Sequence, residues 1–136
     1  MLYSAPLPYV VNAGEYYAAI AELPWAIWLD SGGKGRYDIL VAQPIATLVT
    51  RDANTEINDA TGQRQSDADP FELLREQLGS PISVLPDIPF CGGALGYWGY
   101  DLARRWINLT GHDGNAERLP DMAVGIYDWA VLIDHQ

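Results

Sequence analysis

Residues 25–50 read WAIWLDSGGKGRYDILVAQPIATLVT, and this stretch decides the fold class that the sequence predicts. It contains three apolar runs, at 25–29, 37–42 and 46–50, each long enough for a strand and too short for a typical helix. The glycine-rich residues 30–35 and Pro44 separate the runs, as loop residues do. Parallel neighbours need a crossover of about a dozen residues, so strands joined this closely are expected to pair antiparallel.

A first helix is expected just before this stretch. Asn12 is its expected N-cap, and Glu15 follows three residues later, as in a capping box. Tyrosine and isoleucine side chains then recur at helical spacing, and Pro24 ends the helix.

A second helix is expected to begin at Pro70. Asp69 suits the N-cap, proline suits the first helical position, and Gly79 suits the C-cap. One face of this helix is expected to hold Phe71, Leu74 and Leu78.

The remaining segments complete the expected fold class. The polar residues 51–69 contain two expected hairpin tips, at 52–54 and 61–62. The glycine-rich residues 90–101 predict a tightly packed strand, residues 102–106 a short helix, and residues 122–134 a strand. The sequence therefore predicts an α+β fold, with a mainly antiparallel sheet and two or three flanking helices, as a single domain over residues 1–136.

Composition and charge exclude several classes of function. The chain has 136 residues, of which 49% are hydrophobic and 19% charged, as expected of a domain with a packed core. Its net charge of −10 opposes binding to nucleic acid and to anionic membrane surfaces. It has no apolar run of about 18 residues and no basic segment followed by an apolar one at its start, so we expect neither a membrane span nor a signal peptide. A cytoplasmic location is expected.

Residue types used in catalysis and metal binding are sparse. Cys91 is the one cysteine, and neither His112 nor His135 forms a motif with it, so a small buried thiol is the expected reading. The pairs His112-Asp113 and Asp134-His135 each offer two metal ligands without a third partner. We therefore expect no catalytic residue and no metal site.

The loop after the first apolar run is the candidate binding site. Ser31 stands at the end of that run, and Lys34 and Arg36 follow it. A hydroxyl, two cations and the rings of Trp25, Trp28 and Tyr37 would suit a small aromatic ligand that carries a carboxylate. The alternative is a solvated turn with two exposed charges.

Four segments carry a resemblance to a known family. They are Leu23–Ile27, the strand from Arg36 with Pro44, the pattern Phe90-x-Gly-Gly-x-x-Gly-Tyr-x-x-Tyr-Asp101, and Leu119–Trp129. In this order they resemble the N-terminal region of the aminodeoxychorismate synthase component I family, which is related to anthranilate synthase component I. The expected structural motif residues are Gly92, Gly93, Gly96, Tyr97, Tyr100 and Asp101.

The resemblance implies a function for the complete protein. That family converts chorismate, with ammonia from a glutamine amidotransferase partner, into 4-amino-4-deoxychorismate for folate synthesis. The reaction needs Mg²⁺, whose ligands and the catalytic lysine lie in a C-terminal chorismate-binding region. We expect this chain to lack that region, to hold no cofactor itself and to be inactive alone.

The resemblance also implies part of a tryptophan pocket. The pocket serine falls on Ser31, and the following segment falls on Lys34, Gly35, Arg36 and Tyr37. Asp30 stands where the anthranilate branch has glutamate.

Other readings stay open at the level of sequence. The chain would alternatively be a fragment of anthranilate synthase component I, a freestanding tryptophan-binding regulatory module or a purely structural subunit. Apolar surface left uncovered by a missing region would favour self-association.

Overall fold

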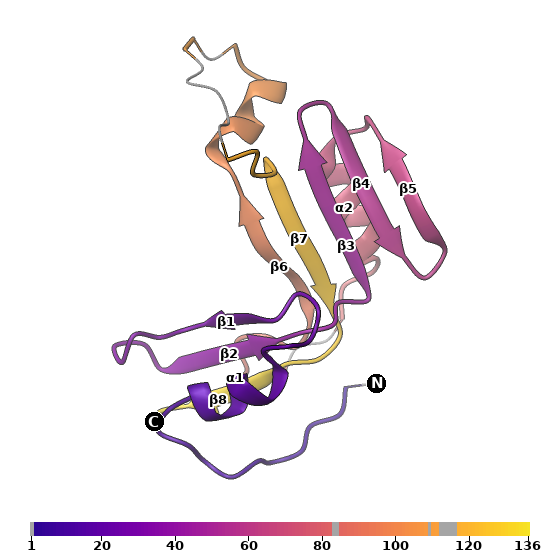
Figure 1. Cartoon of the computed structure of the whole chain (residues 1–136). Helices are drawn as coiled ribbons and strands as arrows, with labels where there is room; N and C mark the ends of the chain where they lie inside the picture. The colour runs from indigo at the N-terminus through magenta and orange to yellow at the C-terminus, as the bar shows by residue number, and fades with distance from the viewer. Residues whose placement is uncertain (1, 83–84, 109, 112–116) are drawn as a thin grey trace. The chain divides into compact units, whose positions relative to one another are not determined.

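The computed structural model describes residues 2–82, 85–108, 110–111 and 117–136. They form two compact units (Figure 1). Unit 1 comprises residues 1–44, 81–93 and 127–136, and unit 2 comprises residues 45–80 and 94–126. The chain thus passes between the units at four places within the span predicted as one domain. Among the described residues, no helix combines the length and the apolar character needed to cross a bilayer.

Unit 1 is a three-stranded antiparallel sheet with one helix. Its elements are α1 (Gly14–Ile20), β1 (Ile27–Leu29), β2 (Tyr37–Val41) and β8 (Val131–Asp134), with β2 in the centre. Trp28 of β1 lies opposite Leu40, and Ile133 of β8 lies opposite Asp38. The core of the unit centres on Ala13, Leu40 and Ile133, against which the α1 side chains Tyr16, Tyr17 and Ile20 pack.

Helix α1 begins slightly later than predicted. Ala13, not Asn12, occupies the N-cap and makes no side-chain cap. Asn12 instead accepts the Gly14 N–H through Oδ1 at 2.9 Å, and its carbonyl accepts the Glu15 N–H. Asn12 therefore stabilises a turn just before the helix. Asparagine side chains hydrogen-bond nearby backbone N–H groups both in such turns and at N-caps, so the sequence alone does not distinguish the two.

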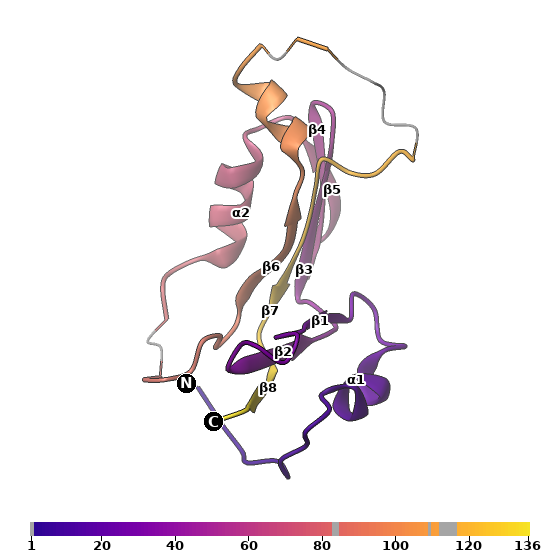
Figure 2. The ribbon, with the colours of Figure 1, turned by 90° about the vertical axis from the view of Figure 1, so that its left-hand side faces the viewer.

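Unit 2 is a five-stranded sheet with a helix on one face (Figure 2). The strands are β3 (Ala46–Arg51), β4 (Asn54–Asp59), β5 (Gly62–Ser66), β6 (Gly93–Trp98) and β7 (Met122–Tyr127), and the helices are α2 (Pro70–Leu78) and the 3₁₀ helix η1 (Tyr100–Arg105). The strand order is β5-β4-β3-β7-β6. Alternate side chains of the sheet, among them Leu48, Ile57 and Val124, form one core with Leu73 and Leu74 of α2.

Several predictions for unit 2 are confirmed. The pairs Arg51–Asn54 and Asp59–Gly62 close two tight hairpins at the predicted tips. Helix α2 has the predicted caps, since the Asp69 carboxylate accepts the Phe71 and Glu72 N–H groups and Gly79 ends the helix with φ +64°.

The face of α2 expected to hold Phe71, Leu74 and Leu78 is buried only in part. Leu74 is buried together with Leu73, whereas Phe71 and Leu78 are 42% and 43% exposed. The expectation of a single strand over residues 122–134 was wrong. The apolar run 122–134 is two strands, because β7 pairs with β3 and β8 pairs with β2. Apolar composition predicts burial in a strand but carries no information on a change of sheet. The α+β class with antiparallel pairing is confirmed.

Candidate functional site

The predicted loop joins β1 to β2 at one end of the unit 1 sheet. It closes back on Ser31, whose carbonyl accepts the N–H groups of Lys34 and Gly35, each at 3.2 Å. Gly32 and Gly33 have φ of +62° and +68°, a backbone conformation that glycine adopts at no steric cost. The sequence Ser-Gly-Gly-Lys-Gly therefore makes a tight turn, with Ser31 half-buried at its base.

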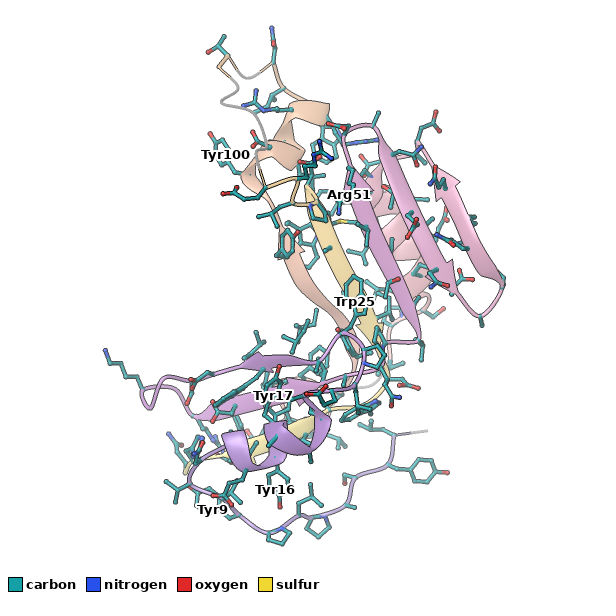
Figure 3. The ribbon with its side chains drawn as sticks, viewed as in Figure 1. Tyr9, Tyr16, Tyr17, Trp25, Arg51 and Tyr100 are labelled. Atoms are coloured by element: carbon teal, nitrogen blue, oxygen red, sulfur yellow. The ribbon has the colours of Figure 1, made fainter. Side chains whose placement is uncertain are left out.

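A hollow of about 410 Å³ lies beside this turn. Its lining includes Asn12 and Ala13 before α1, Trp28 of β1, Ser31 and Gly35 of the loop, and the pair Asp38 and His135. The Trp28 ring also contacts the Tyr17 ring, with centroids 5.6 Å apart. Tyr17 and Tyr16 on α1 and Tyr9 in the segment before it are labelled in Figure 3.

A buried carboxylate fixes the base of the loop. Asp38 is 4% exposed; its Oδ1 accepts the Ser31 N–H at 2.5 Å, and its Oδ2 lies 2.9 Å from Nε2 of His135. Burial alone would raise the pKa of Asp38, but the hydrogen bonds from Ser31 and His135 outweigh it and hold that pKa below its usual value. Asp38 is therefore an anion at neutral pH.

The structure does not bring the five predicted pocket residues together. Ser31 and Gly35 line the hollow, whereas Lys34, Arg36 and Tyr37 do not. Arg36 makes a bidentate ion pair with Asp134, with both N–O distances 2.8 Å, and its guanidinium lies 4.7 Å from the centroid of the Tyr37 ring. The Tyr37 hydroxyl donates to the Asp87 carbonyl at 2.7 Å. These side chains are held by the protein itself.

Asp38 and His135 are the site residues that sequence reasoning missed. Asp38 stands inside a strand at a position whose neighbour in the period-two pattern, Leu40, is fully buried. A charged residue in the buried register of a strand is the signal that could have identified it. The adjacent Asp134 and His135 offer two metal ligands in sequence, but Asp134 pairs with Arg36 while His135 pairs with Asp38.

The remaining candidates for catalysis and metal binding are one cysteine and the pair His112-Asp113. Cys91 is a free thiol that is partly buried, whereas the sequence predicted a buried one. It lines a larger hollow of about 490 Å³ between the N-terminal segment and β8. His112 and Asp113 lie outside the described residues. Across the described ranges, no three His, Cys, Asp or Glu side chains cluster as a metal site would require.

Two motif glycines, Gly92 and Gly96, and the nearby Gly99 lie against backbone carbonyls of residues 121–127. A Cβ would stand 2.9 Å from the Tyr127 carbonyl at Gly92, 2.1 Å from the Ala123 carbonyl at Gly96, and 2.9 Å from the Asp121 carbonyl at Gly99. Glycine is thus required by close packing at these points.

The other motif residues lie at the end of β6 and in η1. The Tyr97 hydroxyl donates to the Pro120 carbonyl, Tyr100 is 83% exposed, and Asp101 accepts from Arg104 at 2.6 Å. They contact protein and solvent in this structure.

No protein-family model matches the chain. It is 45% identical, over 96% of its length, to Aminodeoxychorismate synthase component 1 of Klebsiella aerogenes, and 42% identical, over 92%, to the protein of that name from Escherichia coli (strain K12). It is 30% identical, over 74%, to Anthranilate synthase alpha subunit 1, chloroplastic, of Arabidopsis thaliana. The chain spans 31%, 29% and 19% of these three relatives. The resemblance predicted from the sequence is confirmed.

A solved structure shares the fold. The crystal structure of anthranilate synthase component I from Streptococcus pneumoniae TIGR4 matches 98% of this chain with a TM-score of 0.64, at 22% identity. The chain covers 30% of that protein. The prediction that this fold is a portion of the anthranilate synthase component I fold is therefore confirmed.

Proposed function

We propose that the chain is the N-terminal part of an aminodeoxychorismate synthase component 1, a cytoplasmic protein that converts chorismate and ammonia into 4-amino-4-deoxychorismate. The single observation that supports this is the 42–45% identity to three proteins of that name, which extends over 92–96% of the chain. The amidotransferase that would supply ammonia is the proposed partner, since component 1 names one part of a two-component synthase.

Within this function, we assign the chain no catalytic residue. The chemistry needs Mg²⁺, a hard cation bound by clustered carboxylate oxygens. The described residues do not fit such a site, since none of their acidic and histidine side chains gather in threes. No step of the reaction is therefore placed here, and the chain alone is expected to be inactive.

The part of the function that we place on this chain is a share of a tryptophan pocket at the β1–β2 loop. The hollow beside Ser31 supports this, because it combines an aromatic wall at Trp28 with a hydroxyl and a tight turn. Arg36 is engaged by Asp134, so it is not the proposed carboxylate ligand while that ion pair holds. Lys34 does not line the hollow, but it is exposed on the same loop and is the cation that we propose would reach a ligand carboxylate.

A chimera tests the synthase proposal. This chain would replace the matching segment of the Klebsiella aerogenes relative, and the product from chorismate and ammonia would be identified by mass spectrometry. We expect aminodeoxychorismate from the chimera and no product from the 136-residue chain alone. A folded chimera without activity would overturn the synthase proposal, and turnover by the chain alone would overturn the assignment of no catalytic residue.

A second candidate is anthranilate synthase component I, which the 30% identity to Anthranilate synthase alpha subunit 1, chloroplastic, of Arabidopsis thaliana supports. The product that a complete component I carrying this chain forms from chorismate and ammonia would distinguish the two, since the second candidate predicts anthranilate. A freestanding regulatory module would bind tryptophan with no synthase attached. Calorimetry with this chain and tryptophan measures that binding.

Self-association is also proposed, because large apolar side chains such as Trp98, Trp106 and Leu119 are 41–60% exposed. Sedimentation at increasing concentration tests it, and a constant monomer would contradict it.

A further inference from the structure

A chain of hydrogen bonds joins three distant parts of the sequence beneath the candidate loop. Asp38 of β2 accepts the Ser31 N–H through one oxygen and contacts His135 Nε2 through the other. His135 Nδ1 lies 3.1 Å from the Tyr9 hydroxyl oxygen, and the two rings meet edge to face. The backbone N–H of His135 donates to the Arg36 carbonyl at 2.8 Å, which fixes the residue at the end of β8.

The donor pattern defines one arrangement of the neutral imidazole. An ionised carboxylate only accepts, so Nε2 carries the proton that is donated to Asp38. Nδ1 is then free to accept the Tyr9 O–H. Because the acceptor is an ionised carboxylate, the contact between Nε2 and Asp38 is a charge-assisted hydrogen bond.

We infer that Asp38 is the positioning residue of the β1–β2 loop and that His135 orients its carboxylate. The inference rests on the proposed tryptophan pocket, to which Ser31 belongs. Both Asp38 oxygens are engaged by protein donors, so Asp38 acts on a ligand through the Ser31 backbone. That backbone sets the loop, because its carbonyl closes the turn to Lys34 and Gly35.

Because Ser31 and His135 both donate to Asp38, the Ser31 amide reports the hydrogen bond between His135 and Asp38. The charged and titratable groups around His135 are Asp38 on β2, the adjacent Asp134 with its partner Arg36, and Tyr9 from the N-terminal segment. The two hydrogen bonds share one carboxylate, so a change in the bond from His135 also changes the bond that Asp38 accepts from Ser31.

The first test uses ¹H–¹⁵N NMR of the whole labelled chain. We expect the Ser31 amide proton to resonate far downfield, because it is donated to a carboxylate. In Asp38→Asn this resonance should move upfield and exchange faster. In His135→Gln, which keeps an N–H donor, it should stay downfield. An ordinary Ser31 shift in the wild type, or loss of the downfield shift in His135→Gln, would overturn the inference even if Asp38→Asn does not fold.

The second test measures L-tryptophan binding by calorimetry. Asp38→Asn should weaken binding by about tenfold or more, the cost of one lost charged hydrogen bond. The matched control is Asp59→Asn in unit 2, because Asp59 also accepts a turn N–H, from Thr61 at 2.8 Å, but lies in the other unit. Equal losses in both variants would contradict a positioning role. If the wild type binds no tryptophan, the proposed pocket fails, and the NMR result still decides the role of Asp38.

Discussion

Gly96 of β6 lies directly against the Ala123 carbonyl of β7. A Cβ at position 96 would stand 2.1 Å from that oxygen and 2.7 Å from the Val124 Cα. Both are backbone atoms of a paired strand, so neither can move aside as a flexible side chain would. The glycine at this position of the motif is thereby explained by strand packing.

Replacing Gly96 with alanine is therefore expected to destabilise unit 2 by about 3 kcal/mol, at the upper end of overpacking effects. Denaturant unfolding measures the change. Gly62→Ala is the matched control, since position 62 has φ +116° but no neighbouring atom within 4 Å. Gly62→Ala should lower the unfolding free energy only through the unfavourable positive φ, by about 1–2 kcal/mol. A Gly96→Ala protein as stable as the control would contradict the close approach.

Thr50 and Thr55 face each other across the β3–β4 hairpin, fully buried, with their hydroxyl oxygens 2.8 Å apart. Thr50→Val should cost about 1–3 kcal/mol, because it leaves the Thr55 hydroxyl buried without this partner. The double change to valine should restore most of the loss, since no polar group is then left unpaired. A double-mutant cycle in urea measures the coupling. Strictly additive losses would show that the hydroxyl pair contributes nothing.

Asp69 joins the start of α2 to the residue after η1. Its Oδ1 caps the helix and its Oδ2 accepts the Trp106 Nε1–H at 3.0 Å. Asp69→Ala should lower the unfolding free energy by about 1 kcal/mol, the usual value of an N-cap. Asp69→Asn should lose less, because its amide oxygen can still cap the helix. Thermal unfolding compares the two, and equal losses would show that the cap contributes little.

The parts of the fold that were predictable depend on local chemistry. The α2 caps and the two hairpins follow from residues within a few positions of each other. The break between β7 and β8 was not predictable, because residues 128–130 lie in an apolar run that passes from one sheet to another. The exposure of Phe71 was not predictable, because helical spacing admits two adjacent apolar faces, and only the packing of Leu73 and Leu74 against the sheet selects the buried one.

The candidate site was predictable only in its loop. Ser31 stands out in sequence as a hydroxyl between an apolar run and a glycine turn. The residues that hold it, Asp38 and His135, are 97 positions apart and meet because β8 pairs with β2. The involvement of Arg36 with Asp134 depends on the same pairing. Single-sequence reasoning carries no information on such pairing.

The ion pair between Arg36 and Asp134 predicts a small and salt-sensitive effect. Its hydrogen bond holds the pKa of Asp134 below the usual value, so this stabilisation is present above about pH 4 and is lost as the pH falls through the lowered pKa. Both side chains are 39% exposed, so Arg36→Ala should lower the stability only slightly, and less still at high salt. NMR titration should show the pKa of Asp134 rising in this variant. Arg36→Lys, which keeps the charge without the bidentate geometry, should give an intermediate pKa.

The buried phenol of Tyr127 predicts a late ionisation step at high pH. It is 1% exposed, its hydroxyl donates to the Trp25 carbonyl at 2.9 Å, and burial raises its pKa to about 12. One phenol should therefore remain largely protonated at about pH 11 and ionise near pH 12 in ultraviolet absorbance. Because the folded pKa is raised, the stabilisation is complete below about pH 10 and is lost as the pH rises toward 12. Tyr127→Phe should remove the late ionisation step while the earlier absorbance change persists. If the late step survives in Tyr127→Phe, another tyrosine is its source and the burial argument fails for Tyr127.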